Sequence, residues 1–223
     1  MIFDVDSYSL AAHIQQGLSM ICGDMDSVRP GVLEFYRGKG VRIFKDTDQD
    51  STDLMKCLKF ITESEMLETA VKQRVPDLPE PFDSDIDIVL LGGLGGRADQ
   101  AFSQLHYLYI TATPSSYIWA RDVYLITMES VIFVLEKGLN RIHAPVKPTM
   151  FTENVGIIPI GRPSIITTRG LEWDVTEWPT AFGGQMSTSN HIKAEVIEVE
   201  STERVLFTLE YDHDVQKSKS RQH

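Results

Sequence analysis

Two aspartates flank a methionine in the segment CGDMDS, residues 22–27. On an extended segment, residues two apart point in the same direction, so Asp24 and Asp26 can face one site. Two close carboxylates repel each other unless a proton or a cation lies between them. Mg²⁺ suits such a site because it takes oxygen ligands and bridges carboxylates to substrate phosphates. The segment therefore indicates a Mg²⁺–phosphate site, and the alternative is a solvated turn with an aspartate cap.

A second acidic segment, KDTDQDSTDLMK, covers residues 45–56. Its first three aspartates stand where an EF-hand loop has positions 1, 3 and 5. Position 6 is Ser51 instead of Gly, and position 12 is Cys57 instead of Glu, which excludes an EF-hand. What remains is a strand end, an acidic loop and a helix N-terminus, where backbone N–H groups and the helix dipole favour anions. Asp53 and Lys56 would lie in the first turn and could face a ligand.

The segment LLGGLGGRADQ, residues 90–100, joins an apolar run to helix-compatible sequence. Residues 93–98 satisfy the G-x-G-x-x-G/A dinucleotide pattern, but no acidic residue for the ribose stands at residues 111–116. The Gly-Lys-Ser/Thr of a Walker A loop does not follow either. The glycine amides could approach phosphate oxygens, and Arg97, next to Asp99, could bind them in bidentate fashion. A phosphate-binding turn, an NAD cradle and a plain strand-to-helix turn are the three interpretations.

Hydroxyl and amide side chains are concentrated in the segment GGQMSTSNHI, residues 183–192. They could fix a small polar heterocycle, and a polar hairpin turn is the alternative. A nearby segment, TTRGLEWDV, carries Trp173, which is either a stacking platform or an aromatic residue of a core or sheet face. The hydroxyl and amide set consists of Ser187, Thr188, Ser189 and Asn190.

Alternating strands and helices must position the first three segments. The expected order is a strand at residues 41–45, a helix at 51–73, a Pro-rich connector at 74–85, a strand at 86–91 and a helix at 98–112. The first helix would begin at a Ser51 or Thr52 cap, and Asp50 is a further candidate for that role. Strands that alternate with helices indicate an α/β layer with a parallel sheet.

After Pro114 the sequence changes to short β-rich runs, many of them closed by Gly, Pro or Asn. Closely spaced strands of this kind indicate a sandwich or a barrel. We therefore expect an α/β domain at residues 1–125, an all-β domain at residues 126–211 and a disordered polar tail at residues 212–223.

The composition narrows the function classes. The chain has 223 residues, 42% of them hydrophobic, and a formal net charge of -11, which argues against binding to a nucleic-acid backbone. Its two cysteines, Cys22 and Cys57, do not form a disulfide framework or a C-x-x-C motif. Neither a secretory signal nor an apolar stretch long enough for a membrane span is seen. We expect a soluble cytoplasmic protein with reduced thiols and no membrane partner.

Taken together and in this order, the segments resemble the thiamine pyrophosphokinase family. The resemblance rests on GDMDS, DTDQDSTDLMKCL, LGGLGGRADQ, GIIPIG, TTRGLEW and STSN, and it covers roughly Ile21 to Tyr211. It implies an α/β nucleotide-binding domain followed by a β-sandwich, in a homodimer with active sites between subunits. It also implies transfer of the pyrophosphoryl group of ATP to the primary alcohol of thiamine, which gives AMP and thiamine diphosphate.

The resemblance also assigns roles, motif by motif. The residues that would hold Mg²⁺ against the phosphates, and act in catalysis, are Asp24, Asp26 and Asp53. Arg97 and Asp99 would line another wall of the cleft and would also act in catalysis. The nucleotide site would be lined by Gln49, Thr52, Lys56, Gly92, Gly93, Gly95 and Gly96. The residues that would bind thiamine, contributed by the partner subunit, are Trp173, Ser187, Ser189 and Asn190.

The N-terminal region departs from the family pattern. Family members have further α/β sequence before the GDxDS motif, including an ADGGAN-like loop near the nucleotide, whereas only about twenty residues precede Gly23 here. The parallel sheet is therefore expected to be incomplete. A truncated or alternatively spliced chain, or a misassigned start, would explain this. The alternative function is then a non-catalytic remnant that binds thiamine or pairs with a full-length subunit.

Overall fold

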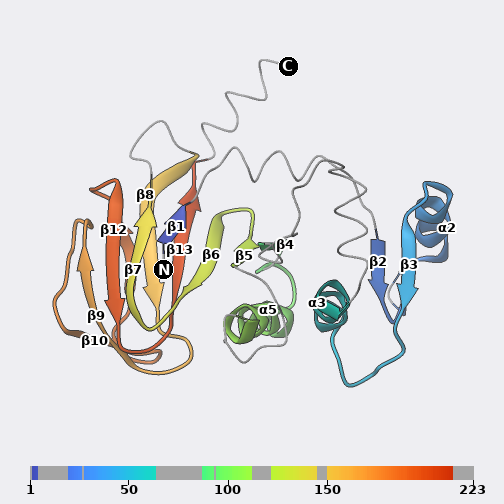
Figure 1. Ribbon diagram of the computed structural model, residues 1–223, viewed down its shortest axis with the longest axis horizontal. Coiled ribbons are helices and arrows are strands. Elements are labelled where there is room, and N and C mark those ends of the chain that lie inside the picture. Colours follow the sequence, from blue (N-terminus) through green and yellow to red (C-terminus); the bar gives the residue numbers. More distant parts are fainter. Residues whose placement is uncertain are drawn as a thin grey trace, which may run out of the picture. The chain divides into compact units, whose positions relative to one another are not determined.

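The computed structural model of the chain describes residues 2–4, 20–26, 28–63, 87–92, 94–111, 122–144 and 150–212. These residues belong to two compact units, which are considered one at a time. The smaller unit holds β2, α2, β3 and α3, and the larger unit holds β1, β4, α5 and the strands β5 to β13 (Figure 1).

The smaller unit is built around two parallel strands. Strand β2 (Met20–Gly23) pairs with β3 (Arg42–Lys45) in a register that runs from Met20 opposite Arg42 to Gly23 opposite Lys45. Helix α2 (Pro30–Gly38) forms the crossover between them, as a parallel pair requires, and Pro30 stands at its first turn, where a missing N–H costs nothing. Helix α3 (Asp53–Glu63) contacts β2.

The larger unit contains two sheets. The six-stranded sheet has the order β11-β8-β13-β6-β5-β4, in which only the β4–β5 pair is parallel. Its strands are β4 (Ile88–Leu91), β5 (Val123–Ile126), β6 (Ser130–Leu135), β8 (Phe151–Ile158), β11 (Ser187–His191) and β13 (Val205–Tyr211). Helix α5 (Ala98–Thr111) contacts β5 and β6.

The five-stranded sheet has the order β1-β7-β12-β9-β10 and is antiparallel except for the β1–β7 pair. Its strands are β1 (Ile2–Asp4), β7 (Gly138–His143), β9 (Ser164–Arg169), β10 (Trp178–Thr180) and β12 (Val196–Ser201). The two sheets form a sandwich (Figure 1).

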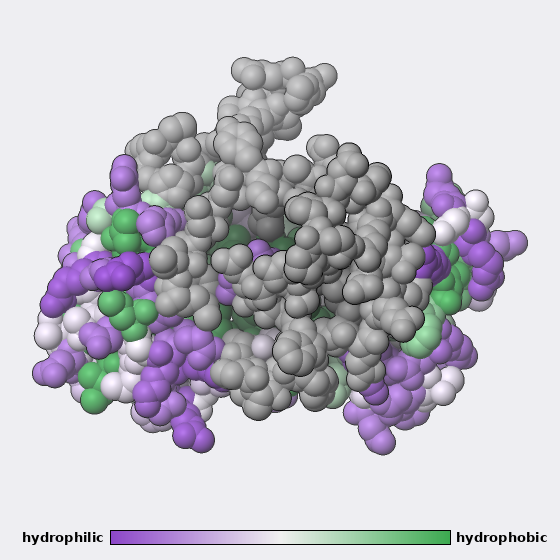
Figure 2. All heavy atoms as spheres, viewed as in Figure 1, coloured by the Kyte–Doolittle hydropathy of each residue, from purple (hydrophilic) through white to green (hydrophobic). Residues whose placement is uncertain are grey.

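One apolar core joins the two sheets of the sandwich. It combines Phe133 and Phe207 of the six-stranded sheet with Ile142, Ile166 and Ile197 of the five-stranded sheet, each at most 1% exposed. Alternate residues of each strand point inward, which explains the period of two in strands such as β7 and β12. Hydrophilic residues cover much of the described surface in Figure 2, with separate hydrophobic areas between them.

The expected fold class is confirmed. The chain has a helical, parallel-sheet part followed by a mostly antiparallel β-sandwich region. Of the helix expected at residues 51–73, the structure describes Asp53–Glu63, and the Pro-rich connector and the tail beyond Asp212 lie outside the described residues. None of the described helices has the length and hydropathy needed to cross a bilayer.

The units divide the chain differently from the expected boundary at residues 125 and 126. Strand β5 pairs with β4 on one side and with β6 on the other, so the sheet of the sandwich continues into the strand that precedes the glycine turn. Helix α5 and the glycine turn therefore belong to the larger unit. The domain limits at 1–125 and 126–211 stay predictions.

Candidate active site

The acidic segments meet at the carboxyl edge of the β2–β3 pair in the smaller unit. Because the strands are parallel, the residues that follow them lie at the same edge of the sheet. Asp24 follows β2 and Asp46 follows β3, and the Asp46 N–H donates to the Gly23 carbonyl at 2.9 Å. Helix α3 begins a few residues later at Asp53. This topology brings the GDMDS and DQDSTD motifs together.

Asp53 is held directly against the GDMDS segment. The Asp24 N–H donates to Asp53 Oδ1 at 3.2 Å, and the Asp26 N–H donates to Asp24 Oδ1 at 2.9 Å. Gly23 lets the carboxylate approach this closely, because a Cβ there would lie 2.7 Å from Asp53 Oδ1. Asp24 and Asp53 are therefore neighbours in space. Asp26 is exposed, and its backbone N–H is bonded to Asp24.

Lys56 lies behind the two carboxylates and is only 3% exposed. Its Nζ is 3.7 Å from Asp53 Oδ1 and 4.0 Å from Asp24 Oδ2. A buried ammonium group requires a charge partner, and these carboxylates provide it. The sequence predicted Lys56 as part of a nucleotide site, but it contained no signal that the side chain is buried under both aspartates.

The acidic loop before α3 is organised by its own hydrogen bonds. The Asp48 N–H donates to Asp46 Oδ1 at 3.0 Å, and the Asp50 N–H donates to Asp48 Oδ1 at 2.9 Å. The Ser51 hydroxyl also donates to Asp48, and this bond lowers the pKa of the Asp48 carboxyl. Gln49 is exposed, and its amide donates to a loop carbonyl at 3.4 Å.

Thr52 caps helix α3. Its hydroxyl accepts the Met55 N–H at 3.3 Å, and its carbonyl accepts the Lys56 N–H at 3.0 Å. Of the caps that the sequence allowed, Thr52 is therefore confirmed, while the Ser51 hydroxyl bonds to Asp48 within the loop instead. The cap fixes the first turn of the helix, and Asp53 with it.

The carboxylate pair suits a Mg²⁺ site that is completed by substrate phosphates and water better than one formed by protein ligands alone. Among the described residues, no group of three or more His, Cys, Asp or Glu side chains is arranged to hold a metal ion. Mg²⁺ usually takes one or two carboxylates together with substrate phosphates and water. Asp24 and Asp53, joined by a backbone hydrogen bond, provide such a pair.

Both cysteines of the smaller unit are free. The Cys57 thiol donates to the Cys22 carbonyl at 3.6 Å. Burial raises the pKa of Cys22 to about 12, with a contribution from the neighbouring Cys57, and burial also raises the pKa of Cys57. The two thiols are therefore protonated packing groups beside the carboxylate pair.

The glycine turn of the larger unit follows β4. The Gly92 N–H donates to the Ile126 carbonyl at 3.0 Å, with a positive φ of 109° that favours glycine. Gly96 also has a positive φ, of 79°, whereas Gly93 lies outside the described residues. Gly95 and Gly96 are exposed, with open space where a Cβ would lie. The turn thus leaves its backbone accessible.

Arg97 and Asp99, at the start of α5, bind each other. Arg97 Nε is 3.1 Å from Asp99 Oδ1, and a terminal nitrogen of Arg97 donates to Asp99 Oδ2. This bidentate hydrogen bonding raises the pKa of Arg97 and lowers that of Asp99. Both side chains are well exposed. The Arg97 guanidinium, which we predicted to bind phosphate, therefore has a carboxylate as its partner in this structure.

Three of the four predicted thiamine residues line one pocket in the larger unit. The pocket has a volume of about 240 Å³ and includes Trp173, Ser187 and Asn190. Its other lining residues are Ile166, Thr168, Val175, Trp178, Met186 and Thr188. Ser189 is exposed at the irregularity of β11, with a positive φ of 55°. The STSN segment is thus an edge strand with a bulge and not the hairpin turn of the alternative interpretation.

Asn190 is occupied by the backbone of Trp173. Its Oδ1 accepts the Trp173 N–H at 3.1 Å, and its Nδ2 donates to the Trp173 carbonyl at 3.0 Å. Asn190 is only 4% exposed, whereas Trp173 is 54% exposed. The asparagine therefore fixes the position of an aromatic ring that borders the pocket.

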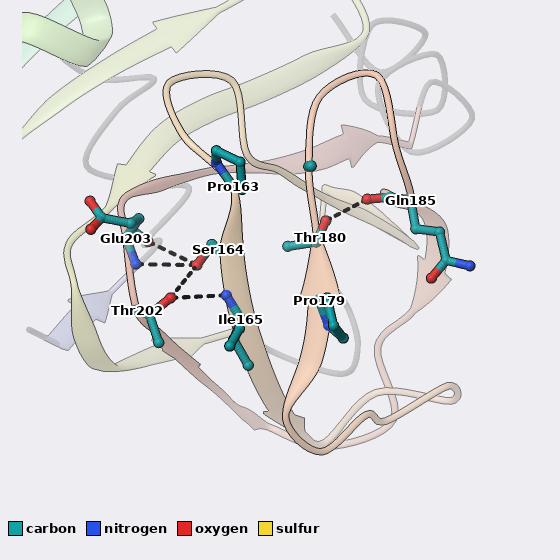
Figure 3. A pocket seen from close by; sticks show the side chains of 9 residues that line it. Pro163, Ser164, Ile165, Pro179, Thr180, Gln185, Thr202 and Glu203 are labelled. Atoms are coloured by element: carbon teal, nitrogen blue, oxygen red, sulfur yellow. Dashed lines mark hydrogen bonds between the residues drawn. The ribbon is translucent and has the colours of Figure 1, made fainter.

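A larger pocket of about 590 Å³ lies at the other end of β9 and β10 (Figure 3). Hydroxyl groups connect its walls: the Thr202 hydroxyl accepts the Ile165 N–H at 2.9 Å, and the Ser164 hydroxyl accepts the Glu203 N–H at 3.2 Å. Opposite them, the Thr180 hydroxyl donates to the Gln185 carbonyl at 2.7 Å. No sequence motif indicated this pocket, because its lining residues come from separate strands.

Comparison with known families finds two matches. Residues 6–120 match the family described as thiamin pyrophosphokinase, catalytic domain, and residues 140–206 match the thiamin pyrophosphokinase vitamin B1 binding domain. The first match contains the acidic segments and the glycine turn, and the second contains the Trp173 pocket. A dinucleotide interpretation of residues 93–98 is not consistent with this assignment.

Relatives and solved structures agree with these matches. Thiamine pyrophosphokinase 1 of Arabidopsis thaliana is 34% identical over 93% of this chain and 71% of that protein. Thiamine pyrophosphokinase 3 of Oryza sativa is 34% identical over 87% of this chain and 66% of that protein. This chain therefore spans about two thirds of the length of these plant relatives. Thiamin pyrophosphokinase from Candida albicans superimposes with a TM-score of 0.73 at 27% identity, over 92% of this chain and 78% of that chain.

Proposed function

The chain belongs to the thiamine pyrophosphokinase family, and we propose that it transfers the pyrophosphoryl group of ATP to the primary hydroxyl of thiamine, which yields AMP and thiamine diphosphate. The observation that carries the proposal is the carboxylate pair Asp24–Asp53 over the buried Lys56, within the match to the catalytic domain. Attack on the β-phosphorus requires that the triphosphate be neutralised and the alcohol be held in line.

In this proposal, Asp24 and Asp53 would hold Mg²⁺, with Asp26 as the additional carboxylate of the motif. The bound ion would neutralise phosphate charge and polarise the phosphoryl group under attack. Lys56 holds the two carboxylates in place from behind, at 3.7 and 4.0 Å. A charge fixed in this way needs no reorganisation when the phosphates bind.

The nucleotide phosphates would lie near the N-terminus of α3, where Gln49 and Thr52 precede Asp53. The positive end of the helix dipole favours an anion there. Within the larger unit, we propose that Arg97 exchanges its partner Asp99 for phosphate oxygens. The adjacent exposed backbone of Gly95 and Gly96 would then offer N–H donors to the same anion, whereas the Gly92 N–H is already bonded to the Ile126 carbonyl.

Thiamine would bind in the Trp173 pocket, with Ser187 and the exposed Ser189 as hydroxyl partners and Asn190 acting through Trp173. The volume of about 240 Å³ is below the roughly 300–1,000 Å³ of complete small-molecule sites. We therefore propose that a partner subunit in a homodimer completes the site. The free thiols of Cys22 and Cys57 favour a reducing compartment such as the cytoplasm.

Turnover with purified protein tests this function. In the presence of ATP, thiamine and Mg²⁺, we expect AMP and thiamine diphosphate in equal amounts, and a chelator should stop the reaction. Asp24→Asn and Asp53→Asn should each lower the rate by orders of magnitude, because each removes a metal-bridging charge. The exposed Asp87 provides a matched control, and Asp87→Asn should retain the wild-type rate. A folded wild-type protein that forms neither product would refute the proposal.

The alternative of a non-catalytic remnant receives no support from the comparisons, since both the catalytic and the vitamin-binding domains are matched. Calorimetry separates the two functions. Binding of both ATP and thiamine is expected for the enzyme, whereas thiamine binding without ATP binding or turnover would indicate the remnant.

A further inference from the structure

Trp173 has an exposed ring that is nevertheless held in place by its neighbours. Asn190 holds its backbone from both sides, as described above. Its ring packs on the imidazole of His191, with the ring centroids 4.8 Å apart and the planes tilted by 48°. Trp173 borders the pocket of about 240 Å³, whereas His191 is not one of the lining residues. His191 therefore supports the aromatic wall without forming part of the pocket surface.

His191 is itself anchored by charged neighbours. Its Nδ1 lies 2.7 Å from Glu172 Oε2 and 3.7 Å from Glu153 Oε1. Lys193 Nζ joins the same two carboxylates, at 3.0 Å from Glu172 and 3.2 Å from Glu153. Hydrogen bonds from Lys193 and His191 lower the pKa of Glu172 and so favour its ionised form. The imidazole is thereby fixed from two elements, strand β8 and the turn that carries Glu172.

The charge of this cluster suits a cationic ligand. Its two carboxylates are balanced by one lysine, so the group carries no net positive charge even when the imidazole is protonated. The face of an indole attracts cations through its quadrupole. Thiamine contains a positively charged thiazolium ring, and a neighbouring group with a net positive charge would oppose its stacking on Trp173.

We infer that His191, held by Glu172 and Glu153, is a positioning residue that sets the affinity for thiamine by fixing the ring of Trp173. This inference rests on the proposed function for the identity of the ligand. It predicts a change in substrate affinity with little change in turnover, because His191 is not a lining residue of the pocket and acts only through Trp173. An aromatic contact of this kind corresponds to about a threefold to tenfold change in affinity.

The test compares His191→Ala with His191→Phe, which keeps an aromatic ring but removes the imidazole nitrogens. His191→Ala should raise the KM for thiamine and its calorimetric Kd about threefold to tenfold, with kcat and the KM for ATP unchanged. His191→Phe should restore most of this affinity. The exposed His143 on β7 is the matched control, and His143→Ala should bind thiamine like the wild type. Unchanged thiamine affinity in His191→Ala, or no rescue by His191→Phe, would overturn the inference.

A fluorescence measurement separates this inference from the function on which it rests. In a background with Trp119→Phe and Trp178→Phe, only Trp173 emits as an indole. Acrylamide quenching reports how accessible its ring is, which should increase when the packing of His191 against it is lost. His191→Ala should increase the quenching whether or not the protein turns over thiamine. If the wild type does not bind thiamine, the proposed function fails, and unchanged quenching in His191→Ala would refute the positioning role independently.

Discussion

The substitution Gly23→Ala should displace the Asp53 carboxylate while leaving the fold intact. The added Cβ would lie 2.7 Å from Asp53 Oδ1 and 2.9 Å from its Cγ, about 0.7 Å inside the 3.4 Å at which ordinary van der Waals contact begins. The obstructing atoms belong to a short, half-exposed side chain, which can rotate away at less cost than backbone can move. Asp53 must therefore give up its position against the Asp24 N–H and Lys56.

The expected magnitudes differ for stability and activity. Loss of the hydrogen bond from the Asp24 N–H to Asp53, now 3.2 Å long, should lower the free energy of unfolding by about 1 kcal/mol. Alanine at the positive φ of 154° adds backbone strain of about 1–3 kcal/mol. A displacement approaching 1 Å in a catalytic group can lower the rate by roughly 100-fold. The variant should thus remain folded and become nearly inactive.

The assay pairs urea denaturation with initial rates of thiamine diphosphate formation. Gly31→Ala, in helix α2, is the matched control because no heavy atom lies within 4 Å of its added Cβ. This control should keep the wild-type rate and stability, or gain slightly in stability. A folded Gly23→Ala variant with wild-type activity would refute the view that the position of Asp53 determines catalysis.

Three further outcomes test other parts of the structure. A Cβ at Gly161 would collide with the ring and hydroxyl of Tyr109, so Gly161→Ala should lower the free energy of unfolding by about 1–3 kcal/mol. In a Tyr109→Ala background this penalty should disappear, and additive losses of the two substitutions in urea titrations would contradict the contact. Lys56→Met removes the cation between two carboxylates, so Mg²⁺ should raise the melting temperature of this variant more than that of the wild type, while turnover falls. A smaller effect of Mg²⁺ on the melting temperature would contradict the charge argument. Burial raises the pKa of Cys22 from 9.0 to about 12, so the unfolded chain loses this proton first, and the free energy of unfolding should fall as the pH rises between these values. An equally steep fall of the free energy of unfolding with pH in Cys22→Ala would contradict the role of Cys22.

Local sequence signals were sufficient for the elements that carry the acidic site. The apolar run at residues 41–45, the Thr52 cap and the helical spacing after it predict a strand and a helix, and β3 and α3 confirm both. Sequence spacing also predicted that Asp24 and Asp26 act together. The contact between Asp24 and Asp53 depends on the parallel register of β2 and β3, which no single segment determines.

Side-chain burial and partner choice were beyond the reach of the sequence. Lys56 looks like a solvent-exposed helical lysine, yet tertiary packing buries it under two aspartates. Arg97 looks like a phosphate ligand, yet its nearest carboxylate, Asp99, is available in the same turn. Asn190 looks like a ligand group, yet the bulge in β11 directs its amide to the Trp173 backbone. The outcomes for Lys56 and Asn190 depend on geometry that forms only when distant segments pack, whereas the Arg97–Asp99 pair forms within one turn.

The most direct test of the proposed reaction follows the γ-phosphate of labelled ATP. Because attack at the β-phosphorus moves the whole pyrophosphoryl group, the label should appear in thiamine diphosphate, with unlabelled AMP formed in equal amount. Asp53→Asn should abolish this transfer in a protein that remains folded. Label released as inorganic phosphate with ADP as the nucleotide product, or full transfer by Asp53→Asn, would contradict the account.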